Sequence, residues 1–308
     1  EQQTTRLKNQ QQLPRYRDLS AQMDVLCSAY VVEAIKALGY GAEPGGSFSS
    51  DSLAEQLGVV NEHRRLFVRM LGIMAEDGLL RRDGEQWEVL AKLPPVDSAA
   101  LMNKMAVRFT ECDAELKLVG ACGRSLAEVL NGTADPLQIL FPNGSSEMVE
   151  RLYQDSPFAR VLNSLVEEAV GRIVEQLPQE RPVRILEIGA GTGGTTSQIL
   201  PRLPDDRTEY VFTDVSDLFT VAARKKFRDY PFVRYGVLDI ESDPREQGFA
   251  DHQFDLIVAA NVLHATRDLK ETLGNVQQLL APSGSLVLLE GATRQRWLDL
   301  IFGLTEGW

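Results

Sequence analysis

The feature that most limits the fold of this chain is a repeated pattern in its second half. From residue 183 onward, short apolar runs alternate with stretches of helical character, expected near 195–202, 217–229 and 268–280. The apolar runs are VRILEIG, EYVFTDV, VRYGVLD, FDLIVAANVL and SLVLLE. Runs of this kind are typical of strands buried on both faces, and their alternation with helices predicts an α/β fold with a doubly wound, mostly parallel sheet.

The first half of the chain has a helical pattern instead. Apolar residues recur at helical spacing over 23–38, and SLAEQLG and NEHRRLFVRMLGIMAEDG predict two further helices. Two short strand-like runs follow around an Asp83-Gly84 turn. Three helices and a hairpin predict a winged-helix-like unit over about residues 20–90.

These patterns predict two domains. Residues 1–176 are expected to form a helical N-terminal lid and substrate domain, because residues 98–176 also have a mainly helical pattern. Residues 177–308 are expected to form the ligand-binding core. The opening EQQTTRLKNQQQ is expected to be a linker or an artificial boundary of the chain.

The composition limits the partners that the chain can have. A net charge of -12 opposes binding to nucleic acids, whose phosphates favour basic surfaces. No apolar run is long enough to span a bilayer, and three cysteines at spacings that match no zinc or redox motif favour a reducing compartment. We therefore expect a cytoplasmic protein without nucleic-acid, membrane or metal partners.

A glycine-rich turn follows the first apolar run and predicts a nucleoside site. Glycines permit a tight turn and close approach of a ligand beside a helix N-terminus. Glu187 lies two residues before Gly189, where it would repel the pyrophosphate of NAD but can meet the ammonium of an amino-acid ligand, directly or through water. This favours S-adenosylmethionine. The residues assigned to this turn are Gly189, Ala190, Gly191, Thr192 and Gly193.

Two further acids end the next two apolar runs. Asp214 is placed to bind ribose hydroxyls. Asp239 is placed to meet an adenine amino group, with Leu238 beside it. Each acid alone could instead cap a helix or a turn. Asn261, near the end of the fourth run, is also assigned to the cofactor site.

A histidine and a glutamate are the candidate catalytic pair. His264 follows the fourth apolar run and Glu290 closes the fifth, so adjacent parallel strands would bring the two side chains together. A carboxylate that orients an imidazole and stabilises its protonated form makes it a better general base. The alternative is a histidine and a strand-end acid with no joint role.

Residues 186–193, with Asp214 and Asp239, resemble the class I S-adenosylmethionine-dependent methyltransferases. RLYQDSPFARVLN and ANVLHATRDLKETLGNVQQLLAPSGSLVLLEGATRQRWLDLIFGLTEGW further resemble the C-methyltransferase domains of polyketide synthases. This resemblance implies S-adenosylmethionine as cofactor and S-adenosylhomocysteine as product. It also implies a β-ketoacyl substrate on the phosphopantetheine arm of an acyl carrier protein, methylated at the α carbon, and neighbouring synthase domains.

The same resemblance places the family's catalytic dyad on His264 and Glu290 and an active-site tyrosine on Tyr153. An O-methyltransferase acting on a hydroxyl remains an alternative, because such enzymes also carry a histidine base after the fourth strand. The family's sheet has two further strands after the fifth. We expect them to lie beyond Trp308, or the sheet to be completed differently.

Overall fold

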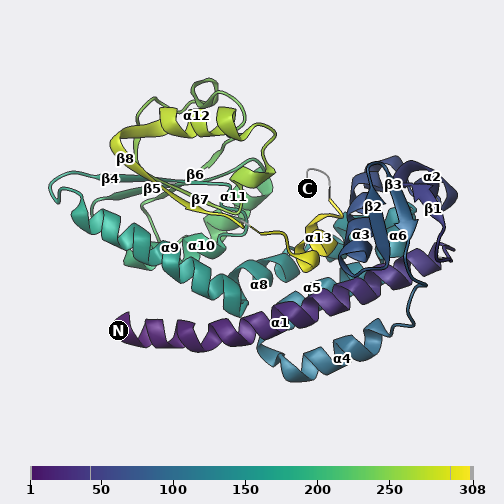
Figure 1. Ribbon diagram of the computed structural model, residues 1–308. Coiled ribbons are helices and arrows are strands. Elements are labelled where there is room, and N and C mark those ends of the chain that lie inside the picture. The colour runs from purple at the N-terminus through teal and green to yellow at the C-terminus, as the bar shows by residue number, and fades with distance from the viewer. Residues whose placement is uncertain (1, 42, 292, 306–308) are drawn as a thin grey trace. The chain divides into compact units, whose positions relative to one another are not determined.

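The computed structural model describes residues 2–41, 43–291 and 293–305. Its helices and strands form two compact units. The first unit contains the described residues up to Leu152 together with the segment from Thr293 onward. The second unit begins at Tyr153 and contains the residues between. Figure 1 labels most of the helices and strands of both units.

A parallel sheet forms the centre of the second unit, and each predicted apolar run is one of its strands. The strand order is β6-β5-β4-β7-β8, and every pairing is parallel. This confirms the predicted doubly wound α/β fold. The strands are β4 (Val183–Ile188), β5 (Thr208–Asp214), β6 (Val233–Val237), β7 (Phe254–Ala260) and β8 (Leu280–Leu289).

Helices cover both faces of this sheet (Figure 1). One apolar cluster joins one face to α9, α10 and α11, and another joins the opposite face to α12. The helices are α9 (Pro157–Gln176), α10 (Gly194–Ile199), α11 (Asp217–Lys226) and α12 (Leu269–Leu279), with short 3-10 helices η4 (Leu200–Arg202), η5 (Pro244–Gln247) and η6 (Leu263–Ala265).

Strand β4 lies in the middle of the sheet and alternates its side chains between the two clusters. Val183 and Ile185 enter the cluster under α9, α10 and α11, whereas Leu186 and Ile188 enter the cluster under α12. The chain goes from β4 to β5 and β6 on one side and then to β7 on the other. Such a reversal creates a crevice at the carboxyl ends of the strands, where open α/β sheets bind ligands.

The division between the units falls at a different place from the expected boundary at residue 176. Helix α9 groups with the sheet because Val166, Val170 and Val174, spaced on one helical face, pack into its core. Conversely, the segment from Thr293 groups with the N-terminal elements.

The first unit contains the three helices and the hairpin predicted for its N-terminal part. The hairpin turns at Gly84, which has a φ of 60°. Its third strand gives the sheet order β1-β3-β2. The elements are α1 (Gln2–Ala37), β1 (Ser47–Ser49), α2 (Ser50–Gln56), η1 (Asn61–His63), α3 (Arg64–Glu76), β2 (Leu80–Asp83) and β3 (Gln86–Val89).

The linker predicted for the first twelve residues is wrong, because α1 begins at Gln2. Gln, Lys, Arg and Leu, which dominate this stretch, have good helix propensity. The predicted helical character of 98–176 is confirmed. Those helices are α4 (Ser98–Arg108), η2 (Thr110–Cys112), α5 (Asp113–Arg124), α6 (Leu126–Leu130), α7 (Pro136–Leu140), η3 (Pro142–Gly144) and α8 (Glu147–Asp155), before α9.

Helix α13 (Arg296–Phe302) is joined to α1, α3 and α5 of the first unit. Arg69 Nε donates to Asp299 over 2.7 Å, in a pair that is largely removed from solvent. Arg296 donates to the Ser28 hydroxyl over 2.6 Å and to Asp77 over 2.7 Å. These bonds connect residues more than 200 positions apart in sequence.

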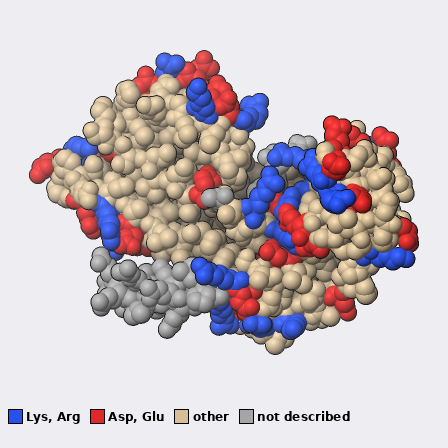
Figure 2. All heavy atoms as spheres, in the orientation of Figure 1, with Lys and Arg blue, Asp and Glu red and all other residues tan. Residues whose placement is uncertain are grey.

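Charged side chains of both signs lie beside one another on the surface shown in Figure 2. In the second unit, Arg234 forms an ion pair with Glu209 at 2.8 Å, and Arg267 forms one with Glu241 at 2.9 Å. Within the part of the chain that the structure describes, no helix is long and apolar enough to cross a membrane.

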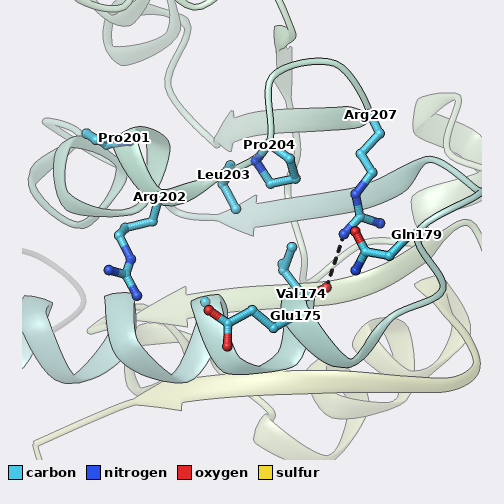
Figure 3. A pocket seen from close by; sticks show the side chains of 9 residues that line it. Val174, Glu175, Gln179, Pro201, Arg202, Leu203, Pro204 and Arg207 are labelled. Carbon is cyan, nitrogen blue, oxygen red and sulfur yellow. Dashed lines mark hydrogen bonds between the residues drawn. The ribbon is translucent and has the colours of Figure 1, made fainter.

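A cavity of about 450 Å³ lies between the end of α9 and the segment that leads into β5 (Figure 3). Arg207 lines it and donates to the carbonyl oxygens of Val174, at 3.3 Å, and Pro178, at 3.0 Å. This cavity precedes the amino ends of β4 and β5, so it is at the opposite edge of the sheet from the predicted site.

The packing of β7 can be tested with two leucines of the second unit. Leu256 is fully buried in β7, whereas Leu218 in α11 is 76% exposed. We expect Leu256→Ala to lower the free energy of unfolding by about 2–5 kcal/mol, and Leu218→Ala to change it by no more than about 0.5 kcal/mol. Denaturant unfolding monitored by circular dichroism measures both. Equal losses would contradict the described packing.

Candidate active site

The turn after β4 depends on glycine. Gly189, Gly191 and Gly193 have φ values of 59°, 53° and 73°, which other residues rarely adopt. A Cβ on Gly189 would lie 2.2 Å from a methyl carbon of Val262, and one on Gly193 would lie 2.7 Å from the ring of Phe227. Side chains at these two positions would therefore displace the loop after β7 or the end of α11.

Backbone groups hold this turn against the neighbouring strand. The Ala190 N–H donates to the Thr213 carbonyl over 2.9 Å, and Lys226 Nζ donates to the Thr192 carbonyl over 2.9 Å. At Gly191, an added Cβ would meet nothing closer than 4.0 Å. The backbone thus remains approachable at Gly191, next to the start of α10. This opening fits a nucleoside ligand such as S-adenosylmethionine.

Glu187 points into the protein and is 1% exposed. Its Oε2 atom accepts hydrogen bonds from the Thr196 hydroxyl at 2.5 Å and the Tyr210 hydroxyl at 2.6 Å. Burial raises the pKa of Glu187 to about 7, although the two hydroxyl donors oppose that shift. A direct contact with a ligand ammonium stays a prediction, and these bonds assign the carboxylate a role in joining β4, α10 and β5.

Asp214 ends β5 and is also buried. Its Oδ2 accepts from the Gly191 N–H over 2.9 Å, and its Oδ1 accepts from the Ser216 N–H over 2.9 Å. Burial raises the pKa of Asp214, while these backbone donors oppose the shift. Each oxygen has further acceptor capacity, so the same carboxylate can shape the glycine turn and accept from ribose hydroxyls.

Asp239 lies two residues after β6 and is half-buried. Its carboxylate accepts from the Glu241 N–H at 3.0 Å and the Ser242 hydroxyl at 2.8 Å. These are the bonds of a turn cap. The Leu238 side chain lies in the core cluster under α12, and its N–H donates to the Asp214 carbonyl over 3.0 Å. The adenine contacts predicted for both residues remain predictions.

The loop after β7 brings the candidate catalytic residues together. Asn261 adopts a φ of 55° and donates its N–H to the Leu289 carbonyl over 2.7 Å. His264 lies in η6, and its Nδ1 is hydrogen-bonded to Oε2 of Glu290, the residue that follows β8. The predicted meeting of the two side chains therefore results from the parallel pairing of β7 and β8.

Glu290 holds the loop as well as the imidazole. Its Oε1 accepts from the N–H groups of Leu263, at 2.7 Å, and Val262, at 3.1 Å. Because a carboxylate only accepts, His264 Nδ1 must carry the proton in this pair. In a neutral His264 the lone pair is then on Nε2, the ring atom that can accept a proton.

The pair shifts both pKa values toward the charged forms. The hydrogen bond to Glu290 raises the pKa of His264, and its burial opposes this only in part. Burial alone would raise the pKa of Glu290, but the hydrogen bond and charge of His264 together with the two loop N–H groups lower it overall. The histidine side chain is 40% exposed, so a substrate can reach it.

Tyr153 is the first residue of the second unit. Burial raises the pKa of Tyr153 to about 12, so its hydroxyl stays protonated near neutral pH and can donate. Its carbonyl oxygen accepts from Asn163 Nδ2 over 3.0 Å.

Sequence reasoning missed several residues that shape this site. Asn163 could have been noticed as a polar residue on the apolar stripe of α9. Tyr210 and Thr196 carry no local signal, because only the packed fold shows that their hydroxyl groups meet Glu187.

A family model described as a methyltransferase domain matches residues 186–286. Among curated proteins, the chain is similar to the non-reducing polyketide synthase mapC of Penicillium roqueforti (strain FM164), with 36% identity over 295 residues. The match covers 93% of this chain, and the chain spans 12% of the length of that relative.

Two solved structures are similar over nearly the whole chain. The CurJ carbon methyltransferase has a TM-score of 0.93 and 46% identity, with 96% of this chain and 78% of that chain covered. The CMeT domain of the citrinin polyketide synthase has a TM-score of 0.85 and 32% identity, with 95% of this chain and 77% of that chain covered.

The buried Glu187 predicts a dependence of stability on pH. Its pKa is raised in the folded state, so the folded protein binds this proton more tightly and its stability should fall as pH rises from about 4.5 to about 7. Glu187→Gln keeps an oxygen acceptor but does not titrate. Between pH 4.5 and pH 7, we expect the unfolding free energy of the variant to rise relative to that of the wild type by on the order of 3 kcal/mol.

Urea unfolding at a series of pH values measures this difference, and the values near pH 4.5 serve as the internal control. Curves for the variant and the wild type that run parallel from pH 4.5 to 8 would contradict the buried, proton-binding state of Glu187.

Proposed function

The chain belongs to the family of C-methyltransferase domains of polyketide synthases, and from this premise we propose that its methyl acceptor is the α carbon of a β-ketoacyl chain held as a thioester on an acyl carrier protein. The chain is an S-adenosylmethionine-dependent methyltransferase. The observation that carries the proposal is the His264–Glu290 pair, at the same edge of the sheet as the glycine turn.

We assign the cofactor to the carboxyl edge of β4, β5 and β6. The turn at 189–193 would admit its amino-acid part, Asp214 would accept from the ribose hydroxyls, and Asp239 would meet the adenine amino group. When bound, S-adenosylmethionine supplies an electrophilic methyl group on its sulfonium. The protein then needs only to generate a nucleophile and align it.

His264 generates that nucleophile in the proposed mechanism. Its Nε2 takes a proton from the α carbon, which is acidic because a ketone and a thioester flank it. The electron pair of the broken C–H bond moves into the enolate, and the proton stays on Nε2. Glu290 stabilises the resulting imidazolium and holds Nδ1 as the donor.

The enolate oxygen needs a hydrogen-bond donor, and we assign Tyr153 to it. Its protonated hydroxyl is suited to this role because donors placed in a buried site stabilise developing negative charge strongly. The first unit is proposed to serve as the lid and substrate domain, since a phosphopantetheine arm needs an enclosed path that a sheet edge alone lacks. Neighbouring synthase domains would deliver the carrier.

Mass spectrometry of a loaded carrier protein tests the acceptor. A β-ketoacyl carrier with two α hydrogens should gain one methyl group, whereas an α,α-dimethyl β-ketoacyl carrier should gain none. Methylation of the second carrier would place the methyl on oxygen and contradict the carbon assignment.

His264→Ala should abolish transfer with S-adenosylhomocysteine affinity unchanged. It should also abolish deuterium exchange at the α carbon without cofactor, and exchange at the wild-type rate would remove His264 as the base.

Glu290→Gln tests how the imidazole is held. The amide oxygen must face the two loop N–H groups, so the amide nitrogen must face Nδ1 of His264. A donor there forces the ring proton onto Nε2, which leaves no lone pair for the substrate. We expect a loss of about 10⁴-fold in kcat, the size seen when a triad histidine is held in the wrong tautomer.

The pH profile provides the second readout for Glu290. A base with a raised pKa is active only above it, so the acid limb of the wild-type profile should lie above about 6.5, and in Glu290→Gln it should move to lower pH. Glu209→Gln is the matched control, because it removes a surface carboxylate paired with Arg234. An acid limb that stays in place in Glu290→Gln would show that the pair does not set it.

A further inference from the structure

Asn163 is a buried polar residue on a helix face that is otherwise apolar. It lies in α9 and is 5% exposed, on the same stripe as Val166, Val170 and Val174. Burying an amide costs free energy unless its polar atoms are hydrogen-bonded. The partners of this side chain therefore show what the amide contributes.

Both ends of the Asn163 amide are used. Its Nδ2 donates to the Tyr153 carbonyl over 3.0 Å, and its Oδ1 accepts from the Thr195 hydroxyl over 3.0 Å. A carbonyl oxygen only accepts, so the amide nitrogen must face Tyr153. One side chain thereby joins the backbone of Tyr153 to the first turn of α10.

Two further contacts hold the same segment. A Cβ on Gly194 would lie 2.8 Å from the Tyr153 carbonyl oxygen, so the backbone there can come this close only because residue 194 is glycine. Lys226 Nζ donates to Gln154 Oε1 over 3.0 Å and to the Thr192 carbonyl over 2.9 Å. The Tyr153–Gln154 segment is thus fixed to residues 192–195 at three points.

We propose that Asn163 is a positioning residue that, through Thr195, sets Tyr153 relative to the glycine turn and thereby aligns the tyrosine hydroxyl for the reaction. This inference rests on the proposed role of Tyr153 as donor to the enolate oxygen. The backbone position of Tyr153 decides where its side chain starts, and a misplacement of about 1 Å can cost on the order of 10²-fold in rate.

A double-mutant cycle with Tyr153→Phe tests this coupling. We expect Tyr153→Phe to lower kcat by about 10²- to 10³-fold, as the loss of one donor to an oxyanion does. Asn163→Ala should lower kcat by about 10- to 100-fold in the wild type but by less than about threefold in the Tyr153→Phe background, because residues that act through one another are not additive.

The isosteric change Thr195→Val keeps the test valid if Asn163→Ala fails to fold. It removes one hydroxyl, and its effect on kcat should likewise disappear in the Tyr153→Phe background. Thr195→Ser retains the hydroxyl and should lose much less than Thr195→Val. Thr208→Val is the matched control, because the buried Thr208 hydroxyl donates to the Pro204 carbonyl over 2.6 Å at the opposite edge of the sheet, and kcat should not change.

Calorimetric titration with S-adenosylhomocysteine separates this role from a defect in cofactor binding. We expect the affinity of Asn163→Ala and Thr195→Val to stay within about threefold of wild type. An equal loss of kcat with and without the Tyr153 hydroxyl overturns the inference alone, as does a loss confined to cofactor affinity. A wild-type rate in Tyr153→Phe overturns the inference together with the proposed role of Tyr153.

Discussion

Gly189 and Gly193, in the turn that follows β4, have no space for a side chain, and the arrangement of the candidate site depends on that restriction. At Gly189 the loop after β7 comes within contact distance, and at Gly193 the end of α11 does. The same turn donates an N–H to Asp214, and the Val262 that packs on Gly189 is itself held by Glu290. A bulkier turn would therefore change the positions of Asp214 and of the His264–Glu290 pair together.

Hydrogen-bonded caps and ligand contacts are not exclusive roles for the strand-end acids. Asp214 and Asp239 each accept from groups in their own turns, as an acid with a purely local role would. Such bonds fix the carboxylate before any ligand binds, so less side-chain entropy is lost on binding. Asp214 differs from Asp239 in also holding the glycine turn, because one of its donors is the Gly191 N–H.

The sheet and the contact between His264 and Glu290 could be predicted from the sequence, because buried strands have a recognisable apolar pattern and adjacent parallel strands end at one edge. The sequence was not sufficient to predict the contacts of Glu187. Strand alternation already puts this residue on the face of Val183 and Ile185, but its hydroxyl partners come from another strand and a helix. The domain boundary and the hydrogen bonds of Asn163 likewise depend on how α9 packs, which no local pattern specifies.

The attachment of α13 to the first unit has a consequence for synthesis on the ribosome. Chains emerge from their N-terminus and domains generally fold as they appear. The contacts of Arg296 with Ser28 and of Asp299 with Arg69 require residues 296–299, which are translated after the entire sheet of the second unit. Helices α1 and α3 can therefore contact α13 only after more than 200 further residues have been translated. The first unit begins to be synthesised before the second, but its folding is completed after the second unit has been synthesised.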